Sequence, residues 1–154
     1  MQMNDFLIGV FASIAATVFV TIIAKWIWPN IKDRCLYNGI RVDGAWDIIE
    51  TRNGNSVNVG RIKLNQQGRI IKGISTRTKT RDGKKSERTF NYNGFVNGNQ
   101  VTLIFEDAQG IGFDTGTYVF IIHNDVKTMV GMATFNGKTE NKIVSEPRTL
   151  SKVV

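Results

Sequence analysis

The opening residues have a different pattern from the rest of the chain. Residues 6–24 form an uncharged apolar run whose polar members are Ser and Thr, which can hydrogen-bond to their own helix. Lys25, Trp26 and Trp28 follow, and such side chains suit a membrane interface. Up to Trp28 the run is as long as the roughly 20 residues that cross a bilayer core, and Pro29 stops it. The pattern predicts one N-terminal transmembrane helix.

The residues around this run predict its processing and its orientation. A cleaved signal peptide normally begins with basic residues, whereas MQMND precedes this run; cleavage and burial as a core helix remain alternatives. Positive flanks stay on the cytoplasmic side of a membrane. The charged flanking residues are Asp5 before the run and Lys25, Lys32, Arg34 and Arg41 after it. We therefore expect a cytoplasmic C-terminal domain, and the lone Cys35 fits such a reducing compartment.

From about Val42 apolar and polar positions alternate, as in half-buried strands. Such runs occur at residues 44–52, 57–66, 69–81, 86–93, 100–106, 115–123, 126–135 and 139–150. Turn signals, several of them Asn-Gly or Asp-Gly, separate them at 53–55, 67–68, 82–83, 97–99, 124–125 and 136–137. The pattern predicts an all-β, eight-stranded antiparallel up-and-down barrel of the lipocalin/calycin type. We expect a transmembrane anchor (1–29), a juxtamembrane linker (30–41) and a cytoplasmic ligand-binding barrel (42–154).

Alternation also predicts which side chains face the barrel interior. They are Trp46, Ile48, Ile62, Leu64, Phe90, Tyr92, Val101, Leu103, Phe105, Tyr118, Phe120 and Ile122. Val119 and Ile121 make the outer face of the sixth strand apolar too, toward a membrane, a second subunit or the linker. Glycines inside strands indicate sharp bends more readily than close approach to a ligand. They are Gly60, Gly73, Gly116 and Gly131.

The two ends of the barrel sequence carry a further structural pattern. Gly44 and Trp46 open the first strand as Gly-x-Trp, and Arg148 lies near the end of the last. This resembles the lipocalin arrangement, in which the Trp closes one barrel end and the Arg packs on it. We expect a structural role for both side chains.

Composition excludes most catalytic chemistry. One Cys and one His, His123, cannot supply a usual zinc ligand set, and no nucleophile or phosphate-loop motif occurs. Asp47 and Glu50 fall on opposite faces of a strand, as do Glu106 and Asp107, so neither pair forms an acid–base couple. We expect no enzyme activity, no catalytic residue, no metal and no cofactor.

Charge points to binding instead. The net charge is +7, and the third and fourth strands concentrate Lys and Arg with interleaved Ser and Thr, which suits phosphate groups. Nearby aromatic rings can stack on a nucleobase. The candidate ligand-binding residues are Arg77, Lys79, Arg81, Arg88, Tyr92 and Tyr118. Alternation places the first three on one face; a solvated hairpin or one attracted to anionic lipid remain alternatives.

Taken over nearly its full length, the chain resembles a known family, the membrane-anchored β-barrel effectors of bacterial CBASS anti-phage defence (CD-NTase-associated protein 15 type). Besides the anchor and the Gly-x-Trp start, the resemblance lies in 64–68 (LNQQG) with Gly73, 90–94 (FNYNG), 116–118 (GTY) and 143–147 (IVSEP). Many members have two transmembrane helices, whereas this chain has one clear span.

The resemblance implies a barrel that binds a cyclic di- or oligonucleotide second messenger. Binding would control homo-oligomerisation and disruption of the bacterial inner membrane, leading to cell death or growth arrest. No DNA partner is expected. Two alternatives are a membrane-tethered lipocalin-like carrier of an apolar molecule and a membrane partner or scaffold protein.

Overall fold

The computed structural model describes residues 2–28, 31, 37–52, 54–80, 83–110, 114–137 and 141–153. The chain divides into two compact units, Met1–Asn38 and Gly39–Val154. Several sequence predictions concern positions outside the described residues: Pro29, Lys32, Arg34, Cys35, Asn53, Arg81 and Asp82.

The first unit contains the apolar helix. Helix α1 (Gln2–Ile22) continues as a π-helical turn, η1 (Ile23–Ile27). The stretch Ile8–Ile27 is long and apolar enough to cross a membrane. Three hydroxyl groups donate hydrogen bonds to carbonyl oxygens four residues earlier, as the sequence predicts, and thereby satisfy their polar atoms within the helix. They belong to Ser13, Thr17 and Thr21, at 2.8–2.9 Å.

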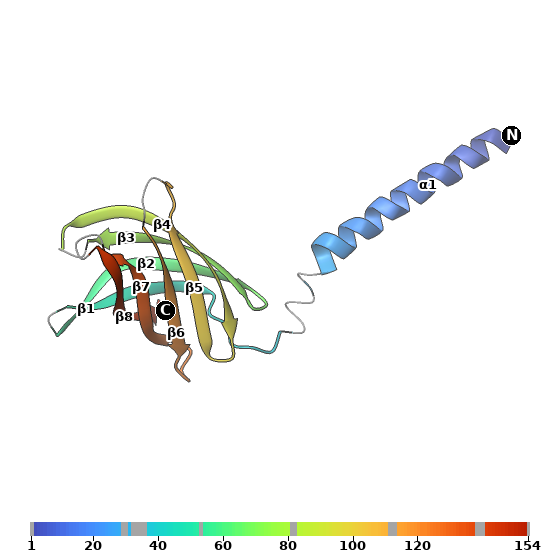
Figure 1. The fold of residues 1–154 in the computed structure, drawn as a ribbon. Helices are drawn as coiled ribbons and strands as arrows, with labels where there is room; N and C mark the ends of the chain where they lie inside the picture. Colours follow the sequence, from blue (N-terminus) through green and yellow to red (C-terminus); the bar gives the residue numbers. More distant parts are fainter. Residues whose placement is uncertain are drawn as a thin grey trace. The chain divides into compact units, whose positions relative to one another are not determined.

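The second unit is a closed antiparallel barrel in which each strand pairs with the next and β8 returns to β1 (Figure 1). Its strands are β1 (Gly44–Arg52), β2 (Asn55–Gln67), β3 (Ile70–Lys79), β4 (Lys85–Asn97), β5 (Gln100–Asp107), β6 (Thr115–Ile122), β7 (Thr128–Gly137) and β8 (Lys142–Lys152). The predicted fold is therefore confirmed. Closure pairs each described strand with a neighbour on both sides, which removes exposed strand edges.

Strand ends deviate from the prediction by a few residues. The largest extension is in β4, which continues to Asn97 because this residue pairs with Gln100 across the hairpin turn. Gly98 in that turn has φ 59°, the left-handed conformation that glycine adopts without strain. In the turn after β6 the left-handed residue is instead Val126, with φ 53°.

All twelve side chains predicted to face inward are buried, each at most 8% exposed. The outer face of β6 is apolar as predicted, with Val119 and Ile121 40% and 56% exposed. The in-strand glycines lie where a neighbouring strand comes too close for a side chain. A Cβ on Gly131 would lie 1.9 Å from the Val119 carbonyl oxygen, and one on Gly116 2.6 Å from the Phe105 ring.

One end of the barrel interior, here called the packed end, is closed around Trp46. The indole Nε1 donates to the Val42 carbonyl oxygen at 2.8 Å. The Gln66 side chain accepts from the Val42 amide at 2.7 Å and donates to the Ile40 carbonyl oxygen at 3.1 Å. The segment that enters β1 is thus tied to β2 from inside the fold.

The expected packing of Arg148 on Trp46 is not observed. Strand register places Lys152 opposite Trp46, and its Nζ lies 5.4 Å from the centre of an indole ring. Arg148 lies opposite Glu50, four residues further along β1. The physical reason is that side chains alternate between the two faces of a strand, so Arg148 and Lys152 of β8 lie on the same face. Strand register then decides which of the two meets Trp46.

Candidate functional site

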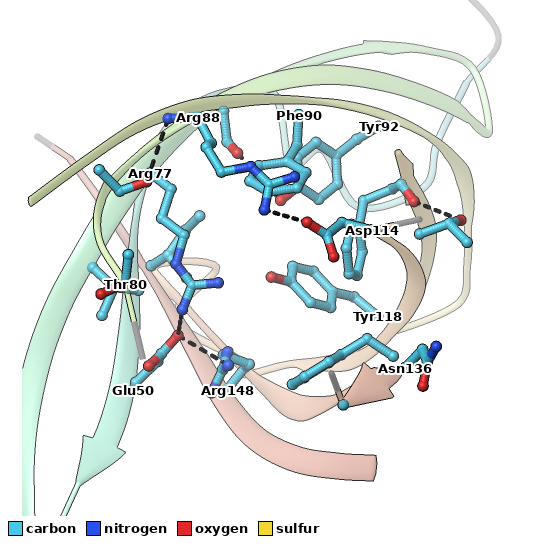
Figure 2. A pocket seen from close by; sticks show the side chains of 18 residues that line it. Glu50, Arg77, Thr80, Arg88, Phe90, Tyr92, Asp114, Tyr118, Asn136 and Arg148 are labelled. Carbon is cyan, nitrogen blue, oxygen red and sulfur yellow. Dashed lines mark hydrogen bonds and ion pairs between the residues drawn. The ribbon is translucent and has the colours of Figure 1, made fainter. Parts of the chain in front are cut away.

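The other end of the barrel interior, here called the charged end, contains a cavity of about 290 Å³ (Figure 2). This volume lies at the lower limit of typical small-ligand pockets, roughly 300 to 1,000 Å³. All eight strands contribute to its lining, which includes Ile48, Glu50, Val59, Ser75, Arg77, Arg88, Phe90, Tyr92, Phe105, Tyr118, Phe135 and Arg148.

One wall of the cavity is aromatic and comes from β4, β5 and β6. Phe105 packs edge-on against Phe90, with ring centres 5.8 Å apart, and lies 5.1 Å from Tyr118. Tyr92 lies within 6 Å of both Phe105 and Tyr118. Gly116 opposite Phe105 leaves room for that ring. The wall offers planar surfaces on which another ring can stack.

The facing wall carries buried charge centred on Glu50. Arg77 from β3 and Arg148 from β8 both bind its Oε1 atom, each at 2.9 Å (Figure 2). Arg148 also contacts Glu146 at 3.0 Å. The Glu50 and Arg148 side chains are only 4% and 5% exposed, so this ion pair is shielded from solvent. Its attraction is therefore stronger than that of a surface pair.

The position of Glu50 follows from local strand geometry. Trp46, Ile48 and Glu50 alternate on the inner face of β1, and their β8 partners continue in register. The pairing of β1 with β2 shifts between Ile48 and Ile49, and Val59 is buried at this irregularity. Such a bulge bends a strand locally, and the inward alternation of β1 continues past it to the buried Glu50.

A second charged group lies beside the aromatic wall. Arg88 from β4 forms ion pairs with Asp107 and Asp114. Its guanidinium carbon lies 5.3 Å from the centre of the Phe90 ring, a distance at which a cation is attracted to the ring face. The hydrogen bond to Asp107 raises the pKa of Arg88, which stays positively charged.

The tyrosine hydroxyl groups add neutral polar atoms. The Ser75 hydroxyl donates to the Tyr92 hydroxyl oxygen at 3.2 Å. Burial, followed by the neighbouring Tyr118, raises the pKa of Tyr92 well above its ordinary value near 10. Tyr92 therefore keeps its proton at neutral pH and remains a hydrogen-bond donor.

Four of the six predicted binding residues line the cavity: Arg77, Arg88, Tyr92 and Tyr118. Lys79 is not among the lining residues and is exposed, although alternation would place it beside Arg77. The pairing of β3 with β4 shifts between Arg77 and Lys79, which breaks the alternation. Arg81 lies outside the described residues.

Sequence reasoning did not assign the acidic partners to the binding site, and it gave Arg148 a structural role rather than a place at the cavity. The opposite faces predicted for Asp47 and Glu50 are confirmed, because Asp47 instead binds Arg61 on the outer surface at 2.8 Å. The sequence does predict that Glu50 faces the interior, because it continues the alternation of Trp46 and Ile48 along the first strand. No such signal identifies Asp114, which lies in a connection outside the strands.

The barrel thus holds a partly solvent-accessible cavity with a stacking wall and a charged wall, which suits a planar ligand carrying hydrogen-bond acceptors. No known family model matches the chain, and no curated protein sequence matches it either, so the functional argument rests on this cavity.

Proposed function

We propose that this protein is a membrane-anchored receptor and effector whose barrel binds a cyclic di- or oligonucleotide in bacterial anti-phage defence. The observation that carries the proposal is the cavity, which places stacking rings opposite guanidinium groups. A nucleobase stacks on aromatic rings, and a phosphate group accepts hydrogen bonds from arginine. The sequence resemblance to CBASS effectors supplies the biological context.

The size of the cavity constrains how such a ligand binds. About 290 Å³ lies just under the lower limit of the range for ligand pockets, roughly 300 Å³. One nucleoside with its phosphate is the natural occupant, and the rest of a cyclic dinucleotide would extend beyond the charged end. The proposal assigns no catalysis to the barrel.

The helix gives the proposed receptor its output. Its apolar stretch would lie in the bacterial inner membrane, with the barrel in the cytoplasm, where nucleotide signals are made. The positive flanking residues support that orientation. Ligand binding would control assembly of several anchors, and the assembled anchors would disrupt the membrane.

The outer face of β6 and β7 supports assembly through a second copy of the chain. Val119 pairs with Met132 and Ile121 with Val130, and all four side chains are between 40% and 56% exposed. A closed barrel has no strand edge to offer, so a copy must bind through a face such as this one. Membrane anchoring raises the local concentration of copies.

The assembly step is tested by cross-linking of the full-length chain in liposomes with and without ligand. Ile121→Lys should abolish ligand-dependent cross-links, because it places a charge within the apolar face. Thr76→Lys, on the outer face of β3, is the matched control and should leave cross-linking unchanged. Equal cross-linking in both variants would reject this face as the contact.

An apolar-carrier function receives less support. Such a carrier needs an apolar cavity, whereas Arg77, Arg88 and Arg148 all line this one. Loss of Arg77 would leave the binding of an apolar ligand unchanged but would weaken nucleotide binding.

The test of ligand binding is a thermal-shift measurement on the full-length chain in detergent micelles with a panel of cyclic di- and trinucleotides. A ligand at a hundredfold excess over Kd stabilises the folded state by about 2.7 kcal/mol, which shifts melting by several degrees. Arg77→Ala should remove the shift, whereas Arg61→Ala, on the outer surface, should retain it. The absence of any shift across the panel would reject the nucleotide receptor.

A further inference from the structure

Arg148 has an unmet hydrogen-bonding requirement. Its side chain is 5% exposed and lines the cavity. Its Nη2 contacts Glu50 and Glu146, and its Nη1 donates to the Pro147 carbonyl oxygen at 3.1 Å. Within the described residues, however, its buried Nε has no hydrogen-bond partner. A buried donor on a charged group is normally satisfied, so the missing acceptor points to a ligand.

The charge around the cavity restricts what that acceptor can be. Among the described residues, three guanidinium groups contact four carboxylates. The guanidinium groups belong to Arg77, Arg88 and Arg148, and the carboxylates to Glu50, Glu146, Asp107 and Asp114. Within these contacts the carboxylates outnumber the guanidinium groups, and two of the carboxylates, Glu50 and Asp114, line the cavity itself. A doubly charged phosphomonoester would be repelled by the carboxylates, whereas a singly charged group would be repelled less.

We propose that Arg148 is the ligand-anchoring residue of the barrel, and that its Nε–H binds a singly charged phosphodiester oxygen in preference to a phosphomonoester. This inference rests on the proposed function but adds a residue and a charge rule to it. Glu50 and Glu146 both engage Nη2, so they hold the guanidinium group without using Nε. Because Nε is buried, the side chain must turn toward the cavity for this N–H to reach a ligand. A phosphodiester occurs both in a cyclic nucleotide and in a phospholipid headgroup, and the experiment separates these sources.

The experiment measures affinity calorimetrically for the full-length chain in dodecyl maltoside micelles, which contain no phosphate. The probes are cyclic dinucleotides, 3′,5′-cyclic mononucleotides paired with the linear 5′-monophosphates of the same bases, and short-chain phosphatidylglycerol. We expect a cyclic probe to bind at least about tenfold more tightly than its linear counterpart.

Two variants test the role of Arg148. Arg148→Lys keeps the charge but lacks the Nε–H, and should weaken cyclic-probe binding about 10- to 100-fold. Arg61→Lys, on the outer surface, is the matched control and should bind as the unsubstituted chain does. Glu50→Gln removes one carboxylate and should narrow the preference for the cyclic over the linear probe. This second variant keeps the charge rule testable if Arg148→Lys fails to fold.

The outcomes separate this inference from the proposed function. If a cyclic probe binds equally well to Arg148→Lys, the anchoring role is rejected while the receptor function stands. If linear probes bind as tightly as cyclic ones, the charge rule is rejected. If no nucleotide binds but phosphatidylglycerol does, and Arg148→Lys abolishes it, the nucleotide function fails while the phosphodiester site stands with a lipid source. If no probe binds, both are rejected.

Discussion

The two ends of the barrel interior are built from the same eight strands but bury different side chains. At the packed end, Trp46, Phe120 and Leu150 are fully buried, and the polar atoms of Gln66 are engaged by backbone groups. At the charged end, Glu50 and Arg148 are buried as an ion pair beside a cavity. Apolar burial stabilises a fold directly, whereas buried ions repay their desolvation only with good geometry. The comparison indicates that apolar packing at one end contributes most to stability, while the other end provides the cavity in which the proposed ligand would bind.

The largest expected effect on stability comes from truncating the buried Trp46 side chain at the packed end. Trp46→Ala should lower the free energy of unfolding by about 3 to 5 kcal/mol, because it removes a fully buried ring and leaves a cavity. Urea unfolding followed by far-ultraviolet circular dichroism measures this change. Ile121→Ala, 56% exposed on the outer face, should change it by less than about 1 kcal/mol. Equal losses in the free energy of unfolding for these two variants would contradict the conclusion that the packed end stabilises the fold.

The next effect concerns the connection between the packed end and the segment that enters β1. Gln66→Leu should cost about 2 to 3 kcal/mol, because it leaves the buried Val42 amide without its acceptor. Hydrogen exchange at Val42 should accelerate in parallel. Asn65→Leu, on the exposed face of the same strand, is the control. Unchanged exchange at Val42 in the Gln66 variant would mean that this contact does not hold the segment.

At the charged end, Glu50→Gln should cost about 1 to 2 kcal/mol, less than the cost of about 3 to 5 kcal/mol for leaving a buried charge unpaired. The cost is lower because the amide still accepts a hydrogen bond and Arg148 keeps Glu146 as its partner. The loss should therefore be smaller than for Trp46→Ala, and denaturant unfolding compares the two directly. A loss exceeding that of Trp46→Ala would reverse the comparison and make the ion pair the main source of stability.

The smallest effect is the titration of Tyr92. Its raised pKa means that the folded state retains the proton longer than the unfolded state does. This contribution to stability is fully present below pH 10 and is lost as pH rises through the folded-state value. Absorbance at 295 nm should show one tyrosine that ionises well above pH 10. Tyr92→Phe should remove that transition, whereas Tyr37→Phe should leave it in place.

Hydrophobic patterning along the chain was sufficient for the architecture. Alternation identified the inward side chains of five strands, and the glycine turns required antiparallel neighbours. Both signals are local, because side-chain direction repeats every two residues and a short turn joins only adjacent strands. Alternation also predicted the inward positions of Tyr92 and Tyr118, which line the cavity, whereas it did not place Arg77 or Arg88 inside the barrel.

Only the tertiary structure decided how charge is distributed inside the barrel. Glu50 meets Arg148 because barrel closure brings the last strand, β8, beside β1. It meets Arg77 of β3 from the other side, across β2, where Arg77 pairs with Gly60. The shift between Arg77 and Lys79 likewise depends on the pairing with β4. Ion pairs form between residues that are distant in sequence, and their partners depend on strand register. For this reason the sequence by itself determined a barrel with a basic hairpin, preceded by an apolar helix long enough to cross a membrane. The fold determined that Arg77, Arg88 and Arg148 form ion pairs and that Arg148 lines the cavity.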